Sequence, residues 1–210
     1  MNDYVFIFDI GKVLLDFNFV PLQEKIAASA QAPLSQVQSE WSNPAYVDVE
    51  TGKTDDRVYY DEFCARIGLT WTFDEWVDQW ANIFTPNPFV HGLYLDLHER
   101  GHAVAMLSNI GPHQVTAIGR GIPEFFSVGT HHFFSFELGL HKPDPAIYHT
   151  VSRKLGRQPQ RCVFLDDAEA NVRGAKGIGM HAMQVTPENH SDVERFVRSF
   201  AADDRPISKG

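Results

Sequence analysis

The stretch Tyr4-Val-Phe-Ile-Phe-Asp9-Ile-Gly-Lys-Val13 decides the fold of this chain. Its first five residues are β-branched or aromatic, which predicts a strand over residues 4–8 that is buried on both faces. An acidic residue follows directly, at the edge where open α/β sheets bind their ligands. Burial of the Asp9 carboxylate there would cost several kcal/mol unless a cation or a set of N–H donors compensates it. The strand therefore predicts a partner for Asp9.

Length and composition are ordinary for a globular enzyme with one substantial core, or with a core domain and a smaller insert. The chain has 210 residues, of which 43% are hydrophobic and 21% charged, and its formal net charge is −9. This acidic balance argues against nucleic acid or an anionic membrane as a partner, because both attract basic surfaces. No apolar run approaches the roughly 20 residues that cross a bilayer, and no basic leader precedes the first strand, so we expect a cytoplasmic protein. Whether it is a monomer or a homodimer stays open.

The predicted elements divide the chain into two parts. Between residues 19 and 84 the periodicity is helical and no strand is predicted; helices are expected over 21–30, 34–41, 54–67 and 73–84. From residue 88 onward strands alternate with helices, which predicts a parallel sheet covered on both faces. We therefore predict an α/β fold with a Rossmann-like, three-layer parallel-sheet core (1–16 plus 88–205) and an inserted small helical-bundle cap (17–87).

Within the predicted core, strands are expected over 102–107, 128–134, 161–165 and 181–185. Helices are expected over 89–100, from residue 112 to about 118, and over 145–155, 168–176 and 191–200. The tail from residue 203 to 210 is expected to be frayed.

Polar residues follow two of these strands, and a lysine precedes one of the helices. Because parallel strands bring their carboxyl ends together, these residues are expected to converge on Asp9. Neighbouring carboxylates repel each other unless a hard cation lies between them, and oxygen ligands favour Mg²⁺. A lysine, a hydroxyl and backbone N–H groups are suited to a phosphate. The residues concerned are Ser108, Asn109, Lys142, Asp166, Asp167 and Asn171.

Four motifs in this order resemble those of the haloacid dehalogenase superfamily: Asp9-x-Gly11, Ser108-Asn109, Lys142-Pro143 and Asp166-Asp167 with Asn171. The first, Phe-Asp-Ile-Gly-x-Val, resembles in particular capped phosphatases such as the bacterial α-D-glucose-1-phosphate phosphatases. The last, Phe-Leu-Asp-Asp, is similar to that of the phosphatase domain of soluble epoxide hydrolases. The motifs extend from Phe6 to Asn171, and their flanking elements bring in nearly the whole chain.

The resemblance implies a Mg²⁺-dependent phosphomonoesterase that hydrolyses a small phosphorylated metabolite, with a sugar phosphate as the expected substrate. The reaction would proceed through an aspartyl-phosphate on Asp9, which would also be a metal ligand. The carbonyl of Gly11 and the carboxylate of Asp167 would be the other protein ligands of the metal.

The resemblance also implies the roles of the remaining residues. Ser108 and the backbone of Asn109 would bind the phosphoryl oxygens of the substrate. Lys142, both catalytic and substrate-binding, would neutralise the charge on nucleophile and phosphate together. Asp166 and Asn171 would support the acidic loop.

One position departs from the common pattern. Most phosphatases of this superfamily carry a second aspartate two residues after the nucleophile as general acid and base, and here that position is Gly11. Loss of a proton donor typically lowers the rate by about 10²–10⁴. We hypothesise that the substrate has a better leaving group, such as an anomeric oxygen, or that Asp16 or a cap residue supplies the proton.

Two other functions compete with this one. A metal-free dehalogenase of the same superfamily would leave the pair Asp166-Asp167 uncompensated beside Asp9, which argues against it. A non-catalytic module that binds a phosphorylated ligand, or an interaction module, is suggested by Gly11, but it would not need the full set of charges. The aromatic residues of the predicted cap are expected to be mostly core; Trp41, Tyr46 and Trp71 are candidates for lining a pocket.

Overall fold

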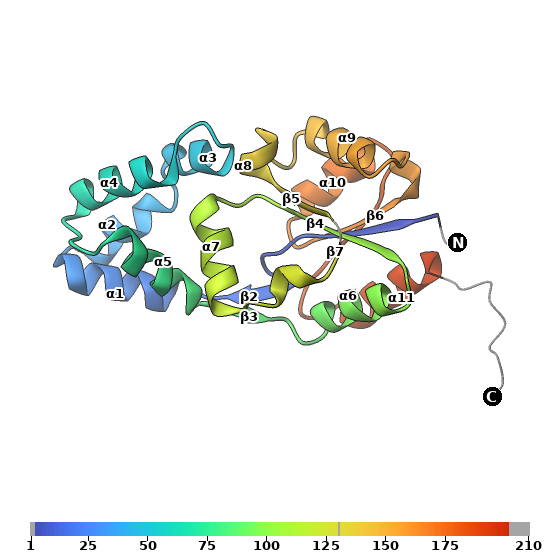
Figure 1. Ribbon diagram of the computed structural model, residues 1–210, viewed down its shortest axis with the longest axis horizontal. Helices are drawn as coiled ribbons and strands as arrows, with labels where there is room; N and C mark the ends of the chain where they lie inside the picture. The colour runs from blue at the N-terminus through green and yellow to red at the C-terminus, as the bar shows by residue number, and fades with distance from the viewer. Residues whose placement is uncertain (1–2, 130, 202–210) are drawn as a thin grey trace.

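The computed structural model describes residues 3–129 and 131–201, and its centre is a parallel five-stranded sheet (Figure 1). The fold-deciding stretch forms the middle strand, β1 (Val5–Phe8), in the order β5-β4-β1-β6-β7. Its partners are β4 (Ala103–Ser108) and β6 (Cys162–Asp166), and the outer strands are β5 (His131–Phe134) and β7 (His181–Gln184). Phe8 lies opposite Met106 in β4 and Leu165 in β6, so the carboxyl ends of these three strands are level.

Helices cover both faces of the sheet, as the alternation of strands and helices predicts. Phe6 and Phe8 face one layer, with α6 (Val90–Glu99) and α11 (His190–Phe200), whereas Val5 and Ile7 face the other, with α9 (Pro145–Lys154) and α10 (Glu169–Gly177) (Figure 1). The strand is therefore buried on both faces, and the predicted α/β parallel-sheet fold is confirmed. Shorter elements complete this part: α7 (Pro112–Gly121), α8 (Ser135–Leu138) and the 3₁₀ turns Phe125–Ser127 and Pro159–Arg161.

A block of five helices follows β1 in the chain and lies beside one end of the sheet (Figure 1). Two short strands, β2 (Leu15–Phe17) and β3 (Phe84–Pro86), pair antiparallel and carry the chain into and out of this block. Its helices are α1 (Val20–Ala30), α2 (Leu34–Glu40), α3 (Pro44–Glu50), α4 (Asp56–Ile67) and α5 (Phe73–Ala81). We propose that residues 17–87 form a cap domain with these two strands as its linkers, and we call the block the cap below.

Three details of the cap differ from the expectation. Helix α3 is not predicted, although Asn43 accepts a hydrogen bond from Ala45 N and Pro44 occupies the first turn, both of which favour a helix start. Helix α5 ends at Ala81 rather than at residue 84, and the chain then enters β3. Strands β2 and β3 are not predicted either, because strands of three residues are too short to show alternation.

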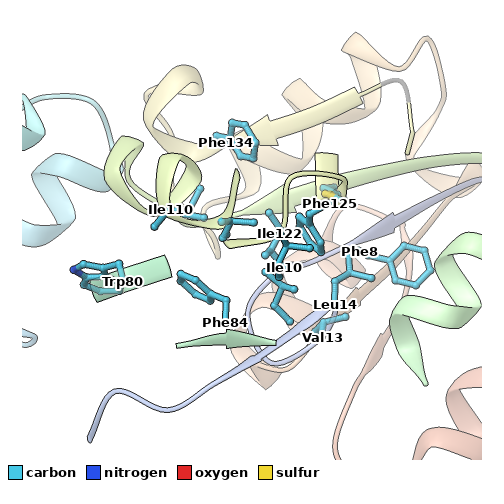
Figure 2. Close-up of a cluster of buried hydrophobic side chains, with 14 of the residues drawn as sticks. Phe8, Ile10, Val13, Leu14, Trp80, Phe84, Ile110, Ile122, Phe125 and Phe134 are labelled. Atoms are coloured by element: carbon cyan, nitrogen blue, oxygen red, sulfur yellow. The ribbon is translucent and has the colours of Figure 1, made fainter. Parts of the chain in front are cut away.

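One hydrophobic cluster runs from the sheet into the cap. Figure 2 shows Phe8, Ile10, Phe84 and Trp80 as members of it, and the rings of Trp80 and Phe84 stack with centroids 6.5 Å apart. As expected, most cap aromatics are core residues, and Tyr59, Tyr60, Phe63, Trp76 and Trp80 are all buried.

Helix α7 holds the cap from the side of the sheet. Arg120 pairs with Asp74 at 3.0 Å and with Asp78 at 2.7 Å, both on α5. Gly121 allows the two helices to approach closely, because a Cβ at this position would lie 2.6 Å from the carbonyl oxygen of Ala81.

In the part of the chain that the structure describes, no helix has the length and apolar character that a membrane span requires. Cys64 and Cys162 are free. The tail predicted to be frayed, together with the end of the predicted core beyond residue 201, lies outside the described residues.

Candidate functional site

The residues singled out in the sequence meet at the carboxyl ends of β1, β4 and β6. They surround the floor of a cavity of about 670 Å³ that extends towards the cap. Asp166 lies beneath this floor and is fully buried. The predicted residues that line the cavity are Asp9, Gly11, Ser108, Asn109, Lys142, Asp167 and Asn171.

We call Asp9, Lys142 and Asp167 the charged floor of the cavity, and Lys142 lies at its centre. Its ammonium lies 2.9 Å from Asp9 Oδ1 and 2.6 Å from Asp166 Oδ2, and it donates a hydrogen bond to the carbonyl of Leu107 at 3.1 Å. The residue is 2% exposed. Burial alone would lower the pKa of Lys142, but Asp9 and Asp166 outweigh it and raise this pKa, so the ammonium stays charged.

The groups around Asp9 bring more negative charge than the ammonium of Lys142 neutralises. Burial raises the pKa of Asp9 to about 7; Asp166 and Asp167 add to this rise, and Lys142 opposes it. Its Oδ1 is buried without a hydrogen bond, although the ammonium of Lys142 is near. The strand thus ends, as predicted, in a carboxylate that needs a cationic partner.

The two aspartates after β6 have different surroundings. Asp166 is held on both oxygens: Oδ2 accepts from Lys142, and Oδ1 accepts from Ala168 N and from Asn171 Nδ2, each at 2.9 Å. Asp167 is half-buried and faces the cavity, and burial together with Asp166 raises its pKa. Asp166 is therefore fixed by hydrogen bonds, whereas Asp167 faces the cavity.

The acidic residues have the chemistry of a divalent cation site. One carboxylate oxygen from each of Asp9, Asp166 and Asp167 lies within 4.8 Å of the other two. Oxygen ligands at this spacing suit Mg²⁺, and the single ammonium of Lys142 cannot balance three carboxylates. The buried Oδ1 of Asp9, which lacks a hydrogen bond, agrees with the fit of a cation here.

Asn109 joins the end of β4 to the loop that carries Lys142. Its Oδ1 accepts from the backbone N of Lys142 at 2.8 Å, and its Nδ2 donates to the backbone O of Lys142 at 3.0 Å. The same Nδ2 lies 3.0 Å from His141 Nδ1, and His141 Nε2 lies 3.0 Å from Glu50 Oε2. Since an amide nitrogen can only donate, the His141 proton lies on Nε2 and points to Glu50.

Glu50 is a site residue that the sequence does not predict. It ends α3, lines the cavity and, through His141, connects the cap to the floor. No motif marks it, and α3 itself is not predicted; the N-terminal signal Asn43-Pro44 is the available hint.

The environment of Gly11 explains its identity. A Cβ at this position would meet Cε1 of Phe17 at 3.0 Å, which is tighter than ordinary contact. The ring of Phe17 therefore occupies part of the space that a side chain at position 11 would need. Asp16 does not line the cavity; it pairs with Thr85 between β2 and β3.

Two of the three aromatic candidates line the cavity. Trp41 and Tyr46 are among its lining residues. Trp71 is not, and its carbonyl accepts a hydrogen bond from the Tyr60 hydroxyl at 2.5 Å.

Comparison with known proteins agrees with the resemblance of the motifs. A family model described as haloacid dehalogenase-like hydrolase matches residues 5–179. A glyceraldehyde 3-phosphate phosphatase of Methanopyrus kandleri is 34% identical over 73 residues, which are 32% of this chain and 31% of that protein, so the chain matches about a third of this relative's length. A sesquiterpene phosphatase of Aspergillus oryzae is 25% identical over 86% of this chain and 88% of its own length.

The fold also occurs in a solved structure. A haloacid dehalogenase family enzyme of Bacteroides thetaiotaomicron, in complex with magnesium, matches with a TM-score of 0.79. It is 19% identical, and the match covers 93% of this chain and all of that one. At this identity the likeness is one of fold.

Proposed function

The chain belongs to the haloacid dehalogenase-like hydrolases, and we propose that it is a Mg²⁺-dependent phosphomonoesterase acting on a small phosphorylated metabolite. The observation that carries this proposal is the buried ammonium of Lys142 between Asp9 at 2.9 Å and Asp166 at 2.6 Å, beside Asp167. This arrangement gives a carboxylate nucleophile, a fixed positive charge and a cation site in one floor. Phosphoryl transfer requires these groups because charge on the equatorial oxygens must be stabilised.

In the proposed reaction, a carboxylate oxygen of Asp9 attacks phosphorus, and the bond between phosphorus and the alcohol oxygen breaks. Water then attacks the phosphorus of the aspartyl-phosphate and releases inorganic phosphate, which restores Asp9. The Ser108 hydroxyl and the backbone N–H of Asn109 bind the phosphoryl oxygens, and Lys142 holds positive charge beside both nucleophile and phosphate.

Mg²⁺ would be held by Asp9, by the Gly11 carbonyl and by Asp167, and when bound it would supply positive charge to the phosphoryl oxygens. The same charge would keep Asp9 ionised near neutral pH, where burial otherwise favours its protonated form. Asp166 and Asn171 would hold the loop that carries Asp167.

We assign the missing proton donor to Glu50. It is the one cap carboxyl among the described residues that line the cavity, whereas Asp16 lies elsewhere. His141 fixes its Oε2, and the other oxygen is left to serve the leaving alcohol. A donor held by the cap would act only when the cap is closed over the substrate.

The relatives say less about the organic part of the substrate than about the reaction at phosphorus. The M. kandleri relative is a phosphatase of glyceraldehyde 3-phosphate, a substrate of the kind that the motifs lead us to expect. The A. oryzae relative is a sesquiterpene phosphatase. The chemistry at phosphorus is the same for both kinds of substrate, so the proposed reaction does not depend on the choice.

Phosphate release from p-nitrophenyl phosphate, with and without Mg²⁺, tests the proposal. We expect turnover that requires Mg²⁺ and that disappears in Asp9→Asn. A dehalogenase would release halide from a 2-haloacid in EDTA, and we rank it lower because three carboxylates around one ammonium call for a cation. Phosphate binding without turnover of any ester would identify a non-catalytic module instead.

A further inference from the structure

The wall of the cavity above the charged floor is apolar. Its residues come from segments far apart in the chain: β2, the start of α1, the end of α2, α3, β3 and α7. They are Phe17, Phe19, Trp41, Val47, Phe84 and Ile118. We call this set the aromatic wall.

The rings of this wall are fixed against each other. Phe17 and Phe19 have centroids 4.6 Å apart, and Phe19 lies 6.0 Å from Trp41. Phe17 also packs edge-on against Phe84 at 6.1 Å. Such packing holds side chains in place before a ligand arrives, so an apolar ligand would meet a surface that is already formed.

Several polar side chains along the cavity are hydrogen-bonded within the protein. Asn43 caps α3 and donates to Glu40, and Gln114 accepts from Gly111 N at 2.8 Å. The Tyr46 hydroxyl lies 3.3 Å from His113 Nε2, and Lys12 donates to the carbonyl of Phe17. A substrate with many hydroxyls would therefore find no free partner in these bonded groups and would replace only part of its hydrogen bonds to water, which disfavours its binding.

Val47 adds a further observation. It is 44% exposed although it is a valine, and it lines the cavity from α3. A ligand against the aromatic wall would cover this side chain. A cavity of about 670 Å³ also falls in the range that holds ligands larger than a bare phosphate.

We propose that the aromatic wall binds the organic part of the substrate, and that the substrate is a phosphate monoester of an apolar alcohol rather than of a sugar. The proposal rests on the phosphomonoesterase function above and adds the class of alcohol. The aromatic wall and the charged floor are parts of one cavity. A phosphate bound on the floor therefore places its ester group against the wall.

Matched esters test the class of alcohol. Hexyl phosphate and D-glucitol 6-phosphate have the same carbon chain and differ in their hydroxyl groups, and both have a primary alcohol as leaving group. We expect kcat/KM to be at least tenfold higher for hexyl phosphate, and to rise by about fourfold per methylene from ethyl to butyl to hexyl phosphate.

The outcomes separate this proposal from the one on which it rests. If p-nitrophenyl phosphate is hydrolysed but D-glucitol 6-phosphate equals or exceeds hexyl phosphate, the apolar class is wrong and the phosphatase stands. A kcat/KM that does not change from ethyl to hexyl phosphate would also show that the apolar class is wrong. If no ester is hydrolysed, including p-nitrophenyl phosphate, both proposals fail.

A pair of exposed valines supplies a matched control in the cap. Val47 lines the cavity, whereas Val58 on α4 is 51% exposed and does not. Val47→Asn is expected to lower the ratio of kcat/KM for hexyl to that for ethyl phosphate, by about fourfold for each methylene group that no longer packs against an apolar side chain. Val58→Asn should leave this ratio unchanged. An equal effect of both substitutions, or no effect of Val47→Asn, would show that the alkyl chain does not meet the wall.

Discussion

Asn109 holds the backbone of Lys142 at both of its polar groups, accepting from its N–H at 2.8 Å and donating to its carbonyl at 3.0 Å. The side chain of Asn109 is therefore turned towards the lysine loop, and only its backbone is left for a phosphate. By this clamp the end of β4 fixes the position of an ammonium that lies beside Asp9. We therefore propose that Asn109 positions Lys142, in addition to the phosphate binding proposed for its backbone N–H.

Substitution Asn109→Leu should remove the clamp while leaving the backbone N–H in place. We expect kcat to fall by about 10²-fold, because a small displacement of Lys142 from the phosphate has effects of this size. The KM for p-nitrophenyl phosphate should change much less than kcat. Asn82→Leu, at the exposed end of α5, is the control and should leave both constants unchanged. A kcat for Asn109→Leu close to that of the wild type would contradict the positioning role.

Gly11→Asp is expected to lower activity rather than to restore the common acid. The new side chain would begin 3.0 Å from Phe17 Cε1, so the ring or the loop must shift, and with it the carbonyl assigned to Mg²⁺. The double variant Gly11→Asp with Phe17→Ala removes this conflict and should be the more active of the two towards ethyl phosphate. Steady-state rates of both variants with ethyl phosphate test this expectation. If Gly11→Asp alone is faster than the double variant, the conflict with Phe17 does not explain the glycine.

Glu50→Gln tests the assigned proton donor. A proton donor contributes about 10²–10⁴-fold when the leaving alcohol is poor, and little when it is an activated phenol. We therefore expect a large loss of kcat with butyl phosphate and a small one with p-nitrophenyl phosphate. Equal losses with both esters would instead assign Glu50 to closure of the cap through His141.

His113 should make the protein sensitive to acid. It is fully buried on α7, packed against Trp76 with centroids 4.5 Å apart, and its Nδ1 has no hydrogen bond. Burial lowers the pKa of His113 to about 3, from an ordinary value of 6.5. Above pH 6.5 both folded and unfolded states are neutral here, whereas below it the unfolded state takes up a proton that the folded state does not.

The free energy of unfolding should therefore decrease as the pH falls from about 6.5 towards 3, by up to about 1.4 kcal/mol per pH unit from this residue. Urea unfolding between about pH 6.5 and about pH 4.5 measures the slope. His113→Gln should reduce the slope whatever its effect on stability at neutral pH, and His98→Gln, at an exposed position on α6, should not. Parallel curves for wild type and His113→Gln would disprove the assignment.

The sequence predicts the sheet well because its strands are buried and differ in period from the helices. The run at residues 4–8 is apolar on both faces, which only a central parallel strand requires, and its acidic end predicts where the polar residues meet. Short elements escape this kind of prediction. Strands β2 and β3 have three residues each, and α3 has seven, so no periodicity distinguishes them.

The floor of the site could be predicted because its residues lie in motifs, most of which directly follow strands, while Lys142 precedes a helix. The wall and Glu50 could not, because they depend on how the cap lies over the sheet. Trp41 and Tyr46 have the same sequence character as Trp71, and only packing places two of them at the cavity. The tight space between position 11 and Phe17 likewise depends on the fold, in which the start of β2 at Leu15 returns to Gly11.

The central claim is that Asp9 forms a covalent bond to phosphorus. Its most direct test is the mass of the peptide that contains Asp9, after acid quenching of the enzyme during turnover of p-nitrophenyl phosphate with Mg²⁺. The proposed mechanism predicts a fraction of this peptide that is heavier by one phosphoryl group, and none in Asp9→Asn. Phosphate release that persists in Asp9→Asn, or a phosphoryl group on another residue, would contradict it.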